Sequence, residues 1–105
     1  MINFLSETLA DIKRVGKTPG EVFWVGCSDG ESAMSWSEFS VAANFKYNNG
    51  YGGNEISLSL VVVFLDGTWL ARFEYDGSEE WRYLKLPTLS AGCKDMTAEQ
   101  LREPI

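Results

Sequence analysis

The segment from Leu60 to Leu86 reads LVVVFLDGTWLARFEYDGSEEWRYLKL and contains three runs rich in β-branched and aromatic residues. Two Asp-Gly pairs, Asp66-Gly67 and Asp76-Gly77, separate the runs, and this dipeptide between strand-forming residues is a strong hairpin signal. The segment from Glu55 to Leu86 therefore predicts a three-stranded antiparallel meander, with its last strand over about Glu80 to Leu86.

The length of each turn sets which side chains face each other across the meander. A two-residue loop at Asp66-Gly67 predicts one wholly apolar side, made by the pairs Phe64 with Trp69, Val62 with Ala71, Leu60 with Phe73 and Leu58 with Tyr75. The other side would carry Val63 with Leu70, Val61 with Arg72 and Ser59 with Glu74. Trp69 is expected in the core. In the second hairpin a two-residue loop would set Glu74 against Glu79, so a longer loop that lets Glu74 meet Arg82 is preferred.

Two helices and one more strand are predicted before the meander. Helical spacing of Leu5, Leu9, Ile12 and Val15, with Asn3 or Ser6 as a cap and Gly16 as a stop, indicates a helix from Asn3 to Val15. The run Glu21 to Gly26 is typical of a strand. Ser35 and Glu38 fit a capping box that begins a second helix, from Trp36 to about Asn44, whose core stripe would be Phe39, Ala42, Ala43 and Trp36.

After Pro87 the chain reads as irregular until Thr97-Ala98-Glu99-Gln100, which offers a capping-box start for a short terminal helix. A chain of 105 residues has room for one domain. The predicted fold is α+β: an antiparallel meander sheet that includes the Val22 strand, two helices packed on one face, and a short C-terminal helix, in a single domain over residues 1–105.

Composition restricts the function classes. Fifteen Asp and Glu against nine Lys and Arg give a net charge of −6, so nonspecific binding to a phosphate backbone is not expected. The chain has no histidine, which removes the commonest general base and metal ligand. The serines and cysteines therefore lack a partner set for covalent catalysis, and we expect neither an enzyme nor a bound metal or cofactor.

The sequence favours a cytoplasmic protein. The first residues lack the basic and apolar regions of a signal peptide, and the longest aliphatic or aromatic run, Leu60 to Leu65, is too short to span a membrane. Cys27 and Cys93 form no Cys-x-x-Cys motif. Reduced structural thiols are the expected state, with a disulfide or a reactive thiol as alternatives.

Four carboxylates, Glu74, Asp76, Glu79 and Glu80, gather at the tip of the second hairpin. They match only part of a calcium loop, and a hairpin tip is normally too wet to raise the pKa of a catalytic acid. The remaining interpretations are a solvated turn that protects a sheet edge, or an acidic recognition surface for a basic patch on another protein.

Aromatic residues supply the other candidate contacts. The segment Tyr47 to Asn54 lacks the Gly-Lys-Ser/Thr ending of a phosphate loop, so it is either a binding loop that uses Tyr47 and Tyr51 or a plain connection. Trp81 beside Arg72 or Arg82 is the preferred contact site, because tryptophan and arginine paired at an exposed edge are typical of interface hot spots.

The pattern W-L-x-R-x-E-Y-D-G-S-E-x-W, from Trp69 to Trp81, resembles small proteins of unassigned activity that are encoded by bacteriophages and prophages. The resemblance covers about Tyr47 to Pro87 and carries no catalytic residue. It implies a short acidic phage protein that acts in a bacterial cytoplasm. In size, charge and lack of a catalytic set the chain is similar to counter-defence inhibitors such as anti-CRISPR proteins, which bind a host complex through their surface.

The leading hypothesis is a non-enzymatic phage-borne module that binds a bacterial host protein or complex, without direct contact to nucleic acid or membrane. It would occlude a basic or nucleic-acid-binding surface through a set of hairpin residues: Glu74, Asp76, Glu79, Glu80 and Trp81. The alternative is a virion structural or assembly protein that forms a homodimer or larger homo-oligomer through an exposed part of Val61, Val63 and Leu70. A third possibility is a ligand-binding or enzymatic domain with the Tyr47 to Asn54 loop over a pocket.

Overall fold

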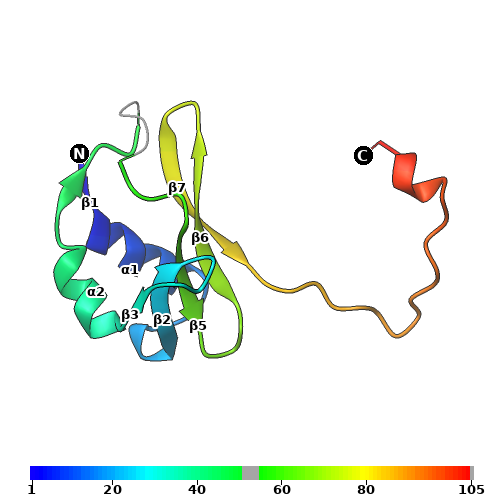
Figure 1. The fold of residues 1–105 in the computed structure, drawn as a ribbon, viewed down its shortest axis with the longest axis horizontal. Helices are drawn as coiled ribbons and strands as arrows, with labels where there is room; N and C mark the ends of the chain where they lie inside the picture. Colours follow the sequence, from blue (N-terminus) through cyan, green and yellow to red (C-terminus); the bar gives the residue numbers. More distant parts are fainter. Residues whose placement is uncertain (51–54, 105) are drawn as a thin grey trace.

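A computed structural model describes residues 1–50 and 55–104. It has α+β architecture, with a five-stranded antiparallel sheet of order β3-β2-β5-β6-β7 and a two-stranded sheet that pairs β1 with β4 (Figure 1). The elements are β1 (Ile2–Asn3), α1 (Phe4–Arg14), the 3-10 turn η1 (Pro19–Glu21), β2 (Val22–Cys27), β3 (Ala33–Met34), α2 (Trp36–Ala42), β4 (Lys46–Tyr47), β5 (Leu60–Phe64), β6 (Trp69–Tyr75), β7 (Ser78–Leu84) and the 3-10 turn η2 (Gln100–Arg102).

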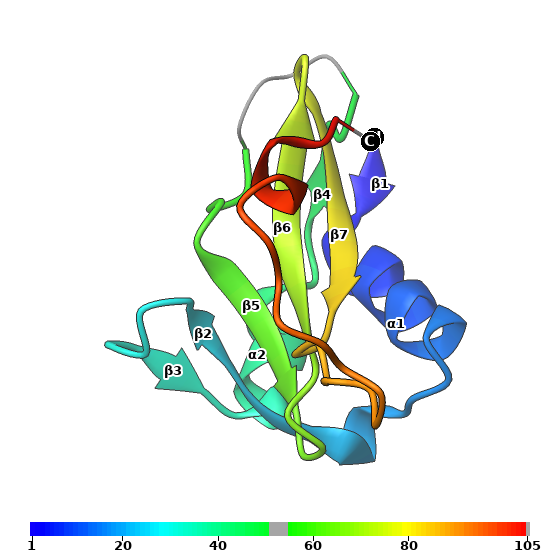
Figure 2. The ribbon, with the colours of Figure 1, turned by 90° about the vertical axis from the view of Figure 1, so that its right-hand side faces the viewer.

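Both helices lie on one side of the five-stranded sheet, as predicted (Figure 1), and in Figure 2 α2 lies behind the sheet and α1 beside the edge of β7. We call the side that faces the helices the inner face and the opposite side the outer face. The core fills the space between the inner face and the helices. Its central members are Phe4, Ile12, Phe39, Val25, Val62, Phe64, Leu70 and Trp81.

The two helices begin where the capping signals place them. The Asn3 side chain accepts a hydrogen bond from the Ser6 amide at 2.9 Å, and Ser35 accepts one from the Glu38 amide at 3.1 Å. The buried stripe of α1 differs from the predicted one, because Phe4 and Thr8 are buried while Leu9 is exposed. Thr8 tolerates burial because its hydroxyl is hydrogen-bonded at both its donor and its acceptor side.

The register predicted for the first hairpin is wrong by one residue. Val62 faces Leu70 and Val63 faces Trp69, because the loop has three residues and only Gly67 in it has a positive φ, of 85°. The Phe64 amide donates to Thr68 O at 2.8 Å and closes the loop. Side chains alternate between faces, so this slip places Leu70 in the core and moves Trp69 to the outer face, half-buried.

The longer loop preferred for the second hairpin is also wrong. Tyr75 pairs with Ser78, so Asp76 and Gly77 alone form the turn, with φ of 53° and 84°. Two successive positive φ values are the signature of a type I′ turn. Glu74 and Glu79 therefore stand opposite each other.

Other boundaries move by a few residues. The residues 55–59 that were expected to start the meander are not in a strand, β7 covers Ser78–Leu84, and α2 ends at Ala42. The terminal helix is the single 3-10 turn η2. Cys27 is half-buried and Cys93 exposed, and both are free thiols.

Candidate functional site

The structure separates the eight residues predicted as a contact site. Asp76 and Glu80 are exposed and Glu74 is half-buried at the hairpin tip, whereas four of the remaining residues are buried: Tyr47, Arg72, Glu79 and Trp81. Tyr51 lies outside the described residues. The acidic hairpin surface thus lacks Glu79 and Trp81, which point to the inner face because the two-residue turn puts odd-numbered residues of β7 on that side.

The four buried residues form one network around the Arg72 guanidinium. Its Nη2 donates to Tyr47 Oη at 2.9 Å and lies 3.8 Å from Glu79 Oε1, while Nη1 donates to Glu7 Oε1 at 3.4 Å. The ring of Trp81 lies 4.8 Å from the guanidinium carbon. The cation-π pair predicted between Trp81 and Arg72 therefore exists, but it lies in the core instead of at an exposed edge. We call Glu7, Tyr47, Arg72 and Glu79 the arginine cluster.

The arginine cluster holds the core together and offers no open surface. Glu79 accepts hydrogen bonds from the Glu55 amide at 2.9 Å and the Ile56 amide at 3.0 Å. Tyr47 Oη donates to Glu7 Oε1 at 2.6 Å. Burial raises the pKa of the Glu7 carboxyl, against the opposing effects of Tyr47 and Arg72. Burial and the bond to Glu7 likewise raise the pKa of the Tyr47 hydroxyl.

Indole N–H groups need partners when they are buried, and Trp81 has one. Its Nε1 donates to Thr8 Oγ1 at 2.9 Å, and the Thr8 hydroxyl donates in turn to Phe4 O at 2.8 Å. The Trp81 ring also stacks on Phe4 with centroids 5.8 Å apart. Trp81 therefore joins β7, the last strand of the sheet, to α1.

The outer face carries the candidate site. Trp24, Val63, Trp69 and Leu84 come from four neighbouring strands and are successive register partners, so they form one apolar row across the sheet. Val61, Ala71 and Arg82 form a second row beside it. Trp24, Val63 and Trp69 are half-buried and Leu84 is 43% exposed. Neither α1 nor α2 covers this face, and the turn η2, which overlaps it in Figure 2, lies far from the sheet in Figure 1.

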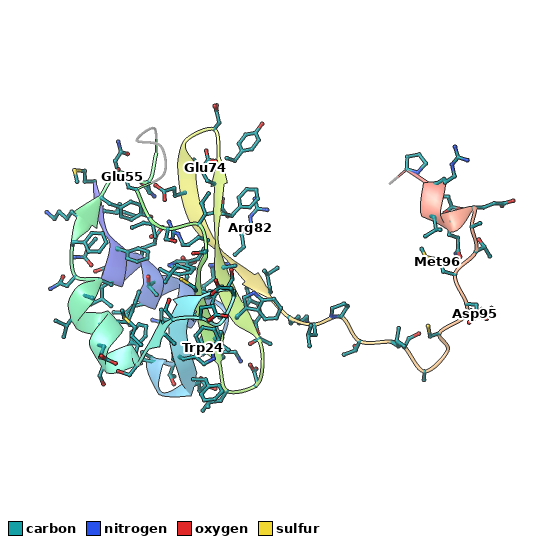
Figure 3. The ribbon with its side chains drawn as sticks, in the orientation of Figure 1. Trp24, Glu55, Glu74, Arg82, Asp95 and Met96 are labelled. Atoms are coloured by element: carbon teal, nitrogen blue, oxygen red, sulfur yellow. The ribbon has the colours of Figure 1, made fainter. Side chains whose placement is uncertain are left out.

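The charged residue of the second row, Arg82, packs on an aromatic ring. The guanidinium carbon of Arg82 lies 3.4 Å from the centroid of the Phe73 ring, and its Nε lies 3.4 Å from Glu80 Oε2. Figure 3 shows the Arg82 side chain on the side of the sheet away from the helices. Tryptophan, arginine and aromatic side chains over an aliphatic floor are the composition of protein-binding hot spots.

This site was missed in the sequence because of the one-residue slip in the first hairpin. Under the predicted register Trp69 lay in the core and Val63 faced Leu70. In the structure the Asp66 side chain accepts hydrogen bonds from the Thr68 amide at 3.0 Å and the Thr68 hydroxyl at 2.6 Å. The first of these bonds is an Asx turn, which Asp residues form in many turns, so the Asp-Gly pair alone did not distinguish a three-residue loop from a two-residue one.

An apolar cavity of about 390 Å³ lies on the other side of the molecule, between α2 and the β2-β3 hairpin. Its lining includes Phe4, Phe39, Leu60 and the Cys27 thiol. The thiol accepts a bond from Ser32 Oγ at 3.2 Å, and no base is placed beside it among the described residues. Core residues such as Phe4 and Phe39 line its floor, and exposed residues such as Met34 and Phe45 line its rim, so it offers space for an apolar group.

Residues 1–50 and 55–104 contain no group of three His, Cys, Asp or Glu side chains placed to hold a metal ion. None of the helices in this part of the chain has the length and apolar character needed to cross a membrane. The chain matches no protein-family profile, no curated protein sequence and no solved structure.

Proposed function

We propose that the chain is a non-enzymatic protein-binding module and that the outer face of its sheet is the contact surface. The observation that carries the proposal is the row of Trp24, Val63, Trp69 and Leu84, which crosses four strands without an element of the described chain above it. An apolar surface of this kind is unfavourable in water. Its burial against a partner would therefore supply free energy for binding.

The charges around the outer face favour a partner with a basic rim. Asp76 and Glu80 are exposed at the end of the β6-β7 hairpin, and the net charge of the chain is −6. We propose a host defence or nucleic-acid-processing complex as that partner, which is the setting implied by the resemblance to phage proteins. The apolar rows would supply affinity, and the acidic residues would speed association with a basic surface.

The alternative function, self-association in a virion or assembly protein, is favoured by a different feature. Of the three residues expected in such an interface, Val61 and Val63 lie on the outer face, but Val61 is buried with 5% exposure and only Val63 is half-buried. The third residue, Leu70, belongs to the core.

The test uses the substitution Trp69→Ala. A tagged chain captures its partner from bacterial lysate, the recovered protein is purified, and the dissociation constant is measured by calorimetry. Loss of a central tryptophan from an interface costs about 2 kcal/mol or more, which is about thirtyfold in affinity. Val41→Ser is the matched control, because Val41 is an exposed apolar residue of α2 on the opposite side of the molecule.

A partner that binds the Trp69→Ala and Val41→Ser variants with the affinity of the natural chain would show that the contact surface lies elsewhere. The double substitution Asp76→Asn and Glu80→Gln separates the role of charge. We expect it to lower the association rate at low salt and to leave the dissociation rate nearly unchanged.

A further inference from the structure

The last part of the chain leaves the folded body. Residues 85–104, which we call the C-terminal arm, follow β7 and form no strand and only the turn η2. Figure 1 shows the arm extending from the sheet on the side away from the helices, and Figure 3 places Met96 and Asp95 far out on it. The hydrogen bonds of the arm are local, such as that from the Cys93 amide to Ser90 O at 3.0 Å.

The arm carries apolar side chains that nothing in the described chain buries. Leu89 is 86% exposed, and Leu86, Met96 and Leu101 are each at least 66% exposed. The arm is also electrically neutral, because three basic residues, Lys85, Lys94 and Arg102, balance three acidic ones, Asp95, Glu99 and Glu103.

The outer face and the arm are therefore two unburied apolar surfaces of one chain, and we propose that the arm of a second copy occupies the outer face. This inference rests on the proposed function for the contact surface and adds a second occupant to it: without the host protein, the arm of another copy covers the outer face. The folded body carries the entire net charge of −6, so two bodies repel each other. A neutral arm can approach the outer face of another copy without that repulsion.

The start of the arm explains why the occupant is a second copy. Leu86 precedes Pro87, and a residue before proline favours an extended backbone, so the chain continues past the end of β7. Gly92 is the first glycine after Leu84, and the first turn of the arm closes at Cys93. Figure 1 shows this part of the arm running away from the sheet, and Leu86 and Leu89 are 73% and 86% exposed, so neither is buried against its own outer face. The 20 residues of the described arm reach roughly 66 Å when extended, which is enough to span a neighbouring body.

Exchange of arms has a defined symmetry. If each of two copies places its arm on the other, the contact is reciprocal and closes a two-fold dimer. Both outer faces are then covered, and both arms are ordered by the partner.

The test is the oligomeric state of the full chain by sedimentation equilibrium. We expect a dimer, with twice the chain mass of 11.7 kDa. An arm variant, Leu86→Ser with Leu89→Ser, and a face variant, Trp69→Ser, are each expected to weaken dimerisation at least tenfold. Leu65→Ser is the control, because Leu65 is exposed in the β5-β6 loop and belongs to neither surface.

Mixing the two variants gives the sharpest result. The arm variant keeps an intact outer face and the face variant keeps an intact arm, so one productive contact forms only between them. Energy transfer between dyes on the two variants should therefore appear in the mixture and not in either variant alone. Leu84→Ser serves as a second face variant if Trp69→Ser proves unfolded by circular dichroism.

Two outcomes overturn the inference. A monomeric natural chain would exclude exchange, and a dimer that the arm variant leaves unchanged would show that the outer faces meet directly. Neither result touches the proposed function, which fails only if Trp69→Ala leaves the affinity for the purified host partner unchanged.

Discussion

Replacing Glu79 with alanine tests the arrangement of the arginine cluster. Glu79 lies in β7 with its side chain fully buried, opposite Glu74. Its carboxylate accepts the amides of Glu55 and Ile56 and lies 3.8 Å from Arg72 Nη2. Glu79→Ala therefore leaves two backbone donors and part of a guanidinium without their acceptor.

The size of the effect follows from these three contacts. A hydrogen bond to a charged group contributes about 1.5–3 kcal/mol, and removal of one partner from a buried ion pair costs about 3–5 kcal/mol. The contacts share one carboxylate, so their energies do not add. We expect Glu79→Ala to lower the free energy of unfolding by about 3–5 kcal/mol, a large part of the roughly 5–15 kcal/mol typical of a domain.

The assay is urea unfolding followed by tryptophan fluorescence. With a denaturant dependence of about 1–3 kcal/mol/M, the midpoint should fall by about 1 M or more. Glu80→Ala is the matched control, because Glu80 is the next residue of β7, faces outward, and pairs with Arg82 at an exposed site. Its loss should cost at most about 1 kcal/mol. Equal costs for the two variants would refute the two-residue turn and the inward position of Glu79.

Three further predictions address other contacts. Thr8→Val leaves the Trp81 indole N–H without its acceptor and should lower the free energy of unfolding by about 1–3 kcal/mol, measured by urea unfolding. Gly26→Ala should cost about 1–3 kcal/mol or more in the same assay, because its Cβ would lie 2.1 Å from Ser32 O in the β2-β3 pairing. The pKa of the Glu7 carboxyl is raised above 4.5 in the folded state, so the folded chain binds a proton at this carboxyl more tightly than the unfolded chain does. The contribution of Glu7 to the free energy of unfolding therefore falls as the pH rises from about 4.5 through the folded pKa. Glu7→Gln should therefore gain stability relative to the natural chain across that window, as measured by unfolding at successive pH values.

A control variant or a specific result tests each of these predictions. Thr8→Ser keeps the hydroxyl, so an equal loss in Thr8→Ser and Thr8→Val would mean that packing and not the hydrogen bond is measured. Gly92→Ala is the control for Gly26→Ala, since nothing lies within 4 Å of the added Cβ. A stability difference between Glu7→Gln and the natural chain that stays constant with pH would contradict the raised pKa.

Local signals in the sequence predicted the elements of the fold. The Asn3 cap, the Ser35-Glu38 capping box and both Asp-Gly turns lie where they were expected, because each depends on residues within three positions of one another. The α+β class and the antiparallel meander followed from them.

Register was not predictable, because the same dipeptide makes two different turns. At Asp76-Gly77 both residues have positive φ, while at Asp66-Gly67 only the glycine does. The second case gives a three-residue loop, which Thr68 closes. One residue of difference exchanges the two faces of a strand, so it decided whether Trp69 belonged to the core or to the surface.

Charge alone also predicts the wrong pairing for the second hairpin. Opposed Glu74 and Glu79 looked unfavourable, yet each carboxylate has its own donors in the structure. Glu74 accepts the Gly77 amide at 2.6 Å, and Glu79 accepts the amides of residues 55 and 56. The donors to Glu79 lie more than twenty positions away in the chain, so no local sequence pattern predicts these hydrogen bonds.

The connection between β4 and β5 is hydrogen-bonded to β7, and these bonds bear on the order in which the elements fold. The Glu79 amide donates to Asn49 O at 2.9 Å, and its carboxylate holds residues 55 and 56, so both ends of the connection are tied to a strand made later in the chain. The β6-β7 hairpin closes over a two-residue turn and has a small loop-closure entropy. The pairing of β2 with β5 encloses α2 and the whole connection, so its loop-closure entropy is much larger. We therefore expect the β6-β7 hairpin to form before the connection becomes ordered. Because Trp81 of β7 is a member of the core, the first half of the chain can acquire its final core only after β7 has been synthesised.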